Sequence, residues 1–263
     1  MTDPIIAFLL WITGLIAGTL GGLLGIGGCV IMLPALTFLF KYSLPVAIGT
    51  TITAVILTAT SGAIAHIRIR NVDYSTAKIV AVSGAIGAAV GSILFFYISN
   101  ELWLLNVILG LAFLYVSIRM IYEGLFKRKL PARLGNEVPG SGFAKATIGF
   151  FVGIITGIVG LGGGYVLVPS YIYLLSSPVK IAVGTSLASF ISMAVVSGAF
   201  KLYQGIVNVI AAICLGVGTI IGAQIGARLT KVIPSWAIKA VFGFVFLAVS
   251  LKFLYNGYVS LMS

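Results

Sequence analysis

Long apolar runs, interrupted by short polar turns, fill almost the whole of this chain. Hydrophobic residues make up 60% of the 263 positions and charged residues only 8%, which is too few to cover the surface of a water-soluble globule. Most of the runs reach the roughly 20 residues that a helix needs to cross the hydrocarbon core of a bilayer. A soluble fold is therefore excluded, and the sequence predicts an all-α integral membrane protein.

Ten helical segments can be drawn along the chain. They cover residues 5–24, 29–41, 45–66, 74–98 and 101–122, and then 143–160, 164–176, 178–203, 206–229 and 235–257. The segments 29–41 and 164–176 are too short to cross a bilayer, and each follows a cluster of glycines. We therefore expect two half-helices among the spanning helices.

The two halves of the chain repeat one another. The matched elements are GIGGCVIMLP (25–34) with GLGGGYVLVP (160–169), AIGTT (47–51) with AVGTS (182–186), Trp103 with Trp236, and Gly110 with Gly243. Matches in the same order along both halves indicate a duplication. We divide the chain into a first repeat (1–124), a basic loop (125–142) and a second repeat (143–263).

The basic residues indicate how the two repeats are related, because short cytoplasmic loops collect Lys and Arg. The central loop and its flanks carry Arg119, Lys127, Arg128, Lys129, Arg133 and Lys145, which places this loop in the cytoplasm. Counting spans from it puts the turns near Arg70 and Lys231 inside as well. With five segments in each half, we expect two inverted repeats with both termini outside the cell. This scheme places Lys41 and Lys201 on the outer side of the membrane, which disagrees with the charge rule.

The two glycine clusters are the best candidates for a binding site. Irregular backbone inside a bilayer is tolerated only where protein buries it or where it lines a wet cavity. Each short helix that follows directs its free N–H groups and the positive end of its dipole toward the glycines, which favours an anion. Pro34 and Pro169 are expected to bend or position these helices. Other glycines are better explained by close helix packing, namely Gly14, Gly18, Gly22, Gly87, Gly91, Gly222 and Gly226.

Hydroxyl side chains follow in both halves, at the start of a spanning helix. Hydroxyls can bind an oxyanion, but they also commonly bond to their own helix, and the sequence leaves both readings open. Tyr165 adds a phenolic donor where the first half has Val30, so the two half-sites differ. The predicted substrate-binding residues are Gly25, Gly27, Gly28, Cys29, Thr50, Thr51, Gly160, Gly162, Gly163, Gly164, Tyr165, Thr185 and Ser186.

Catalysis, metal binding and nucleic-acid binding find little support in this sequence. The single histidine, His66, closes a helix beside a basic turn, where solvation is more common than proton handling. The five acids lie near the ends of apolar runs, where water or headgroups can reach them. Cys29 and Cys214 stand alone and are expected to pack as small buried hydrophobes. The net charge of +11 falls mostly between the runs, where it sets topology. We expect no enzyme activity, no cofactor, no metal and no nucleic-acid partner.

The repeated glycine clusters and the Gly-Thr motifs together resemble the TauE/SafE family of sulfite and organosulfonate exporters, also called the toluene-sulfonate uptake permease family. The resemblance is carried by residues 25–34, 45–50, 160–169 and 178–185, and it extends over essentially the whole chain. Cys29 stands where the second copy has Gly164, so the two repeats differ at the start of the half-helix. The resemblance implies transport of sulfite, sulfonates or related sulfur-containing anions.

The sequence thus predicts a multi-pass transporter of the inner (cytoplasmic) membrane, with a small anion and the lipid bilayer as its partners. A homo-oligomer is compatible with the sequence. The membrane potential, inside negative, drives an anion outward by about 2.3 kcal/mol per charge per 100 mV, so we expect export by alternating access. A passive anion channel is the alternative that would use the same repeats, and an integral-membrane enzyme is a more remote one.

Overall fold

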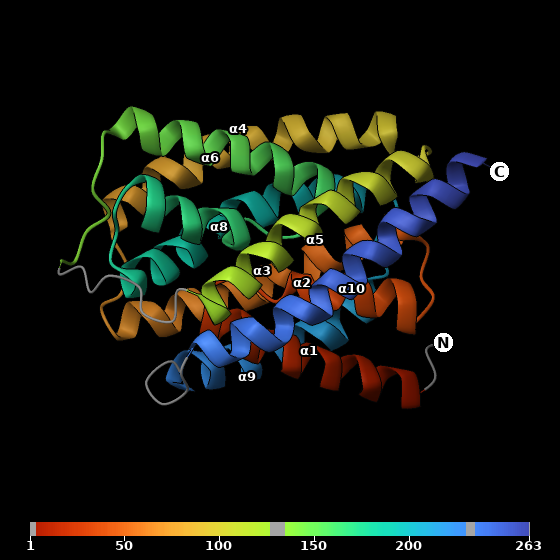
Figure 1. Cartoon of the computed structure of the whole chain (residues 1–263), viewed down its shortest axis with the longest axis horizontal. Coiled ribbons are helices and arrows are strands. Elements are labelled where there is room, and N and C mark those ends of the chain that lie inside the picture. Colours follow the sequence, from red (N-terminus) through yellow and green to blue (C-terminus); the bar gives the residue numbers. More distant parts are fainter. Residues whose placement is uncertain (1–3, 127–134, 230–234, 263) are drawn as a thin grey trace.

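The computed structural model describes residues 4–126, 135–229 and 235–262, and these residues fold into a helical bundle without strands (Figure 1). Eight of the described helices are long and apolar enough to span a membrane. They are α1 (Pro4–Leu24), α3 (Leu44–Arg68), α4 (Tyr74–Ile98), α5 (Leu102–Leu125), α6 (Gly142–Val159), α8 (Val179–Tyr203), α9 (Val209–Leu229) and α10 (Ser235–Met262). The prediction of an all-α membrane protein is confirmed.

The two predicted half-helices are present, and each consists of two short parts. In the first half they are α2 (Cys29–Pro34) and the π-helical turn η1 (Ala35–Leu39), and in the second half α7 (Gly164–Pro169) and η2 (Ser170–Leu174). A proline ends each α-helical part, because it has no N–H to donate and it clashes with the preceding turn. The backbone then continues as a wider π-helical turn, in which the N–H of Phe40 donates to the carbonyl of Ala35 at 2.9 Å.

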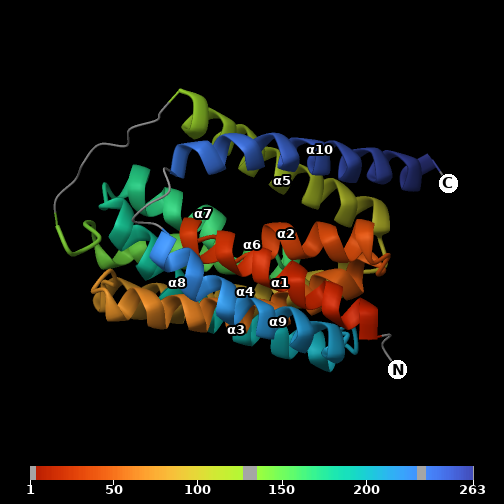
Figure 2. The same cartoon turned by 90° about the horizontal axis from the view of Figure 1, so that it is seen from below.

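Helices of one half of the chain pack against helices of the other half. Helix α1 packs along α9, and its counterpart α6 packs along α4, which is the counterpart of α9. Helices α3 and α8 contact each other, and α5 packs against α10. Figures 1 and 2 show that corresponding helices run in opposite directions along the long axis, for example α1 against α6 and α5 against α10.

Glycines allow these helix pairs to approach closely. A β-carbon on Gly14, Gly18 or Gly22 of α1 would collide with backbone carbonyls of α9. At the corresponding contact between α4 and α6, a β-carbon on Gly87 or Gly91 of α4 would collide with carbonyls of α6. Small residues that let backbones touch are the usual means of helix association in membranes. The packing role that the sequence suggested for these glycines is confirmed.

Both labelled chain ends lie at one end of the bundle (Figures 1 and 2). The end of α5 and the start of α6, which flank the predicted cytoplasmic loop, lie at the opposite end. Within that loop the backbone N–H of Val138 donates to a carboxylate oxygen of Asp73 at 3.0 Å. Several of the basic residues used to orient the chain lie outside the described residues, namely Lys127, Arg128, Lys129, Arg133 and Lys231.

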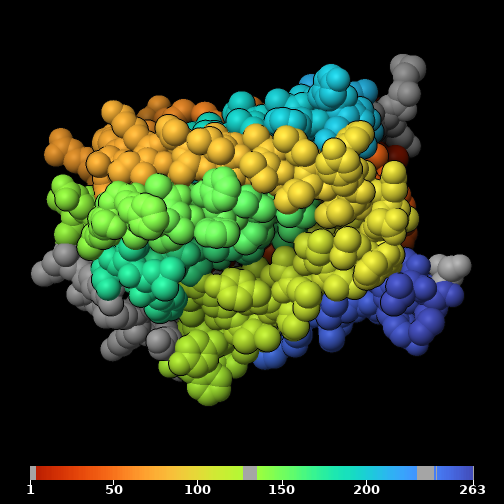
Figure 3. Space-filling view, turned by 90° about the horizontal axis from the view of Figure 1, so that it is seen from above, coloured from red at the N-terminus to blue at the C-terminus, as the bar shows by residue number. Residues whose placement is uncertain are grey.

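The outer surface is apolar over the length of the spanning helices. Figure 3 shows one face, on which α4 and α6 lie side by side. Their outward side chains include Val82, Ile86 and Leu94 of α4 and Phe151 of α6, all of them exposed. Such a face is suited to lipid tails, because no water is needed to cover it.

Two basic side chains are buried against the sequence-based expectation. His66 is only 1% exposed, and its Nε2 lies 3.4 Å from the carbonyl of Gly22, so the prediction of a solvated histidine is wrong. It is buried because the end of α3 packs against Gly22 of α1 and Gly184 of α8. Lys201 is fully buried, with its ammonium 3.2 Å from the ring centroid of Phe95 on α4. A lysine covered by protein says little about sidedness, which explains its disagreement with the charge rule.

Candidate functional site

Each glycine cluster interrupts the helical backbone as predicted. Gly25, Gly27 and Gly28 separate α1 from α2 and have φ angles of 73°, 74° and 78°. Gly160 and Gly162 separate α6 from α7 with φ angles of 67° and 82°. This left-handed backbone is strained for any residue with a side chain, so glycine is required at these five positions.

The two breaks lie directly against each other. A β-carbon on Gly164 would collide with the carbonyl oxygen of Gly25, and one on Gly162 would collide with the Sγ of Cys29. The ring of Phe190 borders Gly27, Gly162 and Gly163. The breaks are therefore brought together as expected, but a thiol and a ring fill the space between them in this conformation.

The predicted hydroxyls mostly bond within the protein. Thr50 Oγ1 accepts the N–H of Asn208 at 3.0 Å, and Thr185 Oγ1 accepts the N–H of Asp73 at 3.0 Å, so the two threonines fix equivalent turns in the two halves. Ser186 donates to the carbonyl of its own helix at Val183, at 2.8 Å. The remaining hydroxyl, Thr51 Oγ1, is buried and has no hydrogen-bond partner among the described residues.

A cavity of about 60 Å³ opens beside the breaks, between α5 and α7. Its lining residues are Leu24, Ile26, Val116, Arg119, Met120, Glu123, Gly164, Tyr165, Val168 and Pro169. The residues of α1 and α5 come from the first half of the chain and those of α7 from the second, so the cavity lies where the two halves meet. Of the predicted site residues, Gly164 and Tyr165 border it.

Tyr165 contributes a hydroxyl with no partner in the described part of the chain. Its side chain is 6% exposed, and the phenolic oxygen is buried without a hydrogen bond. A buried polar group is normally hydrogen-bonded, and leaving one unpaired costs about 1–3 kcal/mol. Tyr165 thus brings an unsatisfied polar group to the residues that line the cavity.

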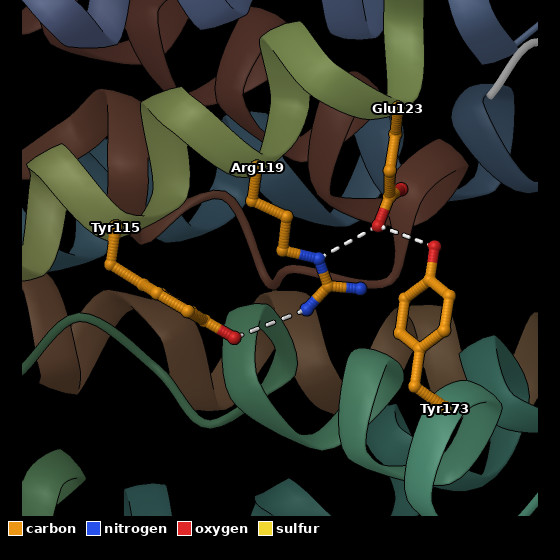
Figure 4. A network of polar contacts seen from close by, with 4 residues as sticks. All are labelled: Tyr115, Arg119, Glu123 and Tyr173. Carbon is orange, nitrogen blue, oxygen red and sulfur yellow. Dashed lines mark hydrogen bonds and ion pairs between the residues drawn. The ribbon is translucent and has the colours of Figure 1, made fainter. Parts of the chain in front are cut away.

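Arg119, a positively charged residue, lines the same cavity, and Figure 4 shows its polar contacts. Its Nε donates to Oε1 of Glu123 at 2.7 Å, and its Nη1 donates to the hydroxyl of Tyr115 at 3.4 Å. The hydroxyl of Tyr173 on η2 donates to the same carboxylate oxygen at 3.0 Å. The guanidinium carbon lies 5.1 Å from the centroid of the Tyr173 ring. The cluster thus links α5 with the second half-helix.

Sequence reasoning missed this pair. It counted Arg119 among the charges of the cytoplasmic loop and expected all five acids to be solvated, but Glu123 and Asp73 are each only 7% exposed. The expectation fails for Glu123 because α5 continues to Leu125, which keeps its carboxylate within the helix and beside Arg119. The available signal was the spacing of Arg119 and Glu123, which puts opposite charges on one face of an apolar helix.

Metal and cysteine chemistry add no further site. Among the described residues no group of three His, Cys, Asp or Glu side chains could hold a metal ion. Cys29 is fully buried and Cys214 is partly buried, and both are free thiols.

Comparisons with known proteins agree on the class of protein. The sulfite exporter TauE/SafE family matches residues 10–253. The chain is 29% identical to the probable membrane transporter protein YunE of Bacillus subtilis, over 96% of this chain and 98% of that protein. It is 28% identical to the probable membrane transporter protein YdhB of Bacillus subtilis, over 85% of this chain and 90% of that protein.

A third relative is a probable membrane transporter protein of Xylella fastidiosa, 28% identical over 95% of this chain and 96% of that protein. No solved structure matches the chain. Since the family match covers nearly the whole chain and eight described helices can span a membrane, the chain belongs to the TauE/SafE family of membrane transporters.

Proposed function

We propose that this transporter exports a small sulfur-containing oxyanion, such as sulfite or a sulfonate, and binds it in the cavity between α5 and α7. The observation that carries the proposal is a cavity lined both by Arg119 and by Tyr165, whose buried hydroxyl has no hydrogen-bond partner among the described residues. A guanidinium presents several N–H donors in a plane and matches an oxyanion with two parallel bonds. The name of the family supports a sulfur oxyanion as the cargo.

The size of the cavity supports a small cargo. A water molecule needs about 10–15 Å³ of such volume, so the cavity of about 60 Å³ has room for a few waters or one small ion. Sites for drug-sized ligands are several times larger. A sulfonate with a long or aromatic tail would need the α5 and α7 walls to separate.

We propose that the halves are inverted repeats, residues 1–124 and 143–263, which alternate access to the site. The packing of the two halves against each other and the opposite directions of their helices support this reading. Inverted repeats of this kind move against each other around a central site in many transporters. The glycine clusters, with Cys29 and Phe190 between them, then form the closed wall of the site.

The remaining basic residues support an orientation with the central loop in the cytoplasm and both termini outside. Helix α3 ends at Arg68, two residues before Arg70, and Figure 1 shows the end of α3 at the end of the bundle where α5 ends and α6 begins. Short cytoplasmic loops are the ones enriched in Lys and Arg. With this orientation in the cytoplasmic membrane, the potential drives an anion from the loop side to the side of the termini.

The proposal is tested by binding to purified protein. Sulfite, thiosulfate, sulfate, sulfoacetate, taurine and acetate are each added at rising concentration, and thermal stabilisation is recorded, since a ligand that binds the folded state raises its melting temperature. We expect stabilisation by a sulfur oxyanion or sulfonate and none by acetate. No response to any sulfur compound would overturn the proposal.

Flux through proteoliposomes then separates a carrier from a channel. A carrier saturates with cargo concentration, because each cycle moves the bound anion through one conformational change. Current that rises in proportion to concentration without saturation would contradict alternating access and identify a channel.

A further inference from the structure

The carboxylate of Glu123 occupies the place where an anion would meet Arg119. One of its oxygens accepts from Arg119 Nε at 2.7 Å and from the Tyr173 hydroxyl at 3.0 Å (Figure 4). Arg119 and Glu123 both line the cavity with Tyr165. A carboxylate is itself an oxyanion, so it uses the donors that a sulfonate or sulfite would use.

A cargo anion in this cavity would be repelled by Glu123 and attracted by Arg119. The side chains are only 8% and 17% exposed, so water screens these charges weakly. The Nε–H of Arg119 cannot donate a full hydrogen bond to Glu123 and to the cargo anion at the same time. Binding of cargo therefore requires the carboxylate to leave Arg119.

When no cargo is bound, the carboxylate of Glu123 is needed to neutralise Arg119. A buried guanidinium without a counter-charge is strongly unfavourable within a membrane protein. With Glu123 in place, the Arg119–Glu123 pair carries no net charge, so an empty carrier can change conformation without exposing a bare cation to a low dielectric.

We propose that Glu123 is a tethered competitor of the cargo, which neutralises Arg119 when the site is empty and is displaced when the anion binds. This inference rests on the proposed anion transport. The loaded site then holds one more negative charge than the empty one, so charge moves with the cargo, as expected for an exporter driven by the potential. In the second half of the chain, position 256 is Asn and offers no anion to its neighbour Lys252, so this device belongs to the first half alone.

The test compares the wild-type chain with Glu123→Gln, which keeps the shape and a hydrogen-bonding oxygen but removes the charge. Ethanesulfonate is the probe, because a sulfonate stays ionised over the whole working range of pH. We expect Glu123→Gln to bind ethanesulfonate about tenfold more tightly, since the competitor is gone. Glu101→Gln is the matched control, because Glu101 is exposed, accepts a hydrogen bond from Trp103 and precedes the first residue of α5, at the opposite end of the helix from Glu123; the affinity of this variant should be unchanged.

Transport should change in a way that simple loss of structure does not produce. In Glu123→Gln proteoliposomes, net efflux should fall about tenfold, because the empty carrier must return with an uncompensated Arg119, while exchange of internal for external ethanesulfonate continues. Tyr173→Phe keeps the charge of Glu123 but removes the hydroxyl that holds it, and we expect about threefold tighter binding. This second variant carries the test if Glu123→Gln does not fold.

The outcomes separate this inference from the proposed function. Unchanged or weaker ethanesulfonate binding in Glu123→Gln, or equal loss of exchange and net efflux, would overturn the role of Glu123 while anion transport stands. If wild-type protein and both variants fail to bind or carry ethanesulfonate and the other sulfur anions, the proposed function itself is wrong.

Discussion

The molecule contains two matched clusters of different character, and each takes its cation from one half of the chain and its aromatic ring from the other. In the first, the guanidinium of Arg119 lies 5.1 Å from the ring centroid of Tyr173, and in the second the ammonium of Lys252 lies 4.5 Å from that of Phe38. The register that pairs Gly110 with Gly243 also pairs Arg119 with Lys252. A cation over an aromatic ring is thus common to both clusters.

The polar groups around that cation are not common to both. Where the first half has Glu123, the second has Asn256. The register that pairs the two half-helix prolines places Val30 opposite Tyr165, so the second cluster lacks that phenol as well. Of the two clusters, the one with the acid contributes Arg119 and Glu123 to the cavity beside the break, which Tyr165 also lines.

Removing the cation should have the largest effect and should show most clearly that the two clusters differ in function. We expect Arg119→Gln to weaken sulfonate binding about 100-fold, because a charge-assisted bidentate contact is lost, whereas Lys252→Gln should change it less than about threefold. Equilibrium binding to purified protein measures both. Arg119→Gln also removes the cation of the Arg119–Glu123 ion pair, and breaking a buried pair costs about 3–5 kcal/mol. The double variant Arg119→Gln/Glu123→Gln should regain stability but not binding; recovered affinity would contradict the assignment.

The starts of the two half-helices give the next largest effect. Gly164→Ala should destabilise the fold by about 3 kcal/mol, because its β-carbon meets the carbonyl of Gly25 and neither backbone can move aside. The matched change Cys29→Gly only removes a thiol and adds backbone freedom, and should cost about 1 kcal/mol. Apparent melting temperatures in detergent rank the two. A Gly164→Ala protein that melts with the wild type would show that the breaks do not touch.

The phenol that distinguishes the halves gives a smaller effect. Tyr165→Phe should weaken sulfonate binding about tenfold, since a hydrogen bond to a charged group is lost, and should leave the melting temperature unchanged because the hydroxyl has no described protein partner. Tyr171→Phe is the control. Its hydroxyl lies 3.3 Å from Ser189 Oγ, so its loss should lower stability slightly and leave binding alone. Equal affinity of Tyr165→Phe and wild type would remove Tyr165 from the site.

The matched turns at Asp73 and Asn208 give the smallest expected effect. Burial would raise the pKa of Asp73, but hydrogen bonds from the Thr76 hydroxyl and from the N–H groups of Val138 and Thr76 outweigh it and hold the pKa below its ordinary value of about 3.9. The stability that Asp73 contributes is therefore present above pH of about 4 and lost as the pH falls further.

Asn208 bonds the N–H of Ala211 at 3.0 Å and does not titrate, so the second half lacks this acid dependence. Asp73→Asn should thus flatten the fall of melting temperature between pH values of about 5 and 3 by a degree or two, a small share of the whole. If the melting temperature of the variant falls as far at acid pH as that of the wild type, other carboxylates cause the fall.

The sequence predicted the spanning helices and both half-helices because length, apolar composition and glycine clusters are local signals. It placed the end of the fifth segment at 122, whereas α5 runs to Leu125, and this small boundary difference hid Glu123. It left the roles of Thr50 and Thr185 open, because their partners, Asn208 and Asp73, lie more than a hundred residues away along the chain. Contacts between the halves have no local signature.

That the charged pair of α5 meets tyrosines of the second half could not be predicted, for the same reason. Arg119 and Glu123 share a helix, but Tyr173, which bonds to Glu123, and Tyr165, which lines the same cavity, come from the other half of the chain. The glycine clusters marked the right neighbourhood, since Gly164 borders the cavity. That the space between the clusters is filled by Cys29 and Phe190 depends on side-chain packing, which a pattern of residue types does not reveal.

The most direct test of the central claim is a structure with 2-bromoethanesulfonate bound, in which the anomalous signal of bromine locates the anion. We predict a single strong bromine position within the cavity between α5 and α7, with the sulfonate beside Arg119 and Tyr165 and the carboxylate of Glu123 turned away. A bromine position between Gly27 and Gly162, or beside Lys252, would contradict this account.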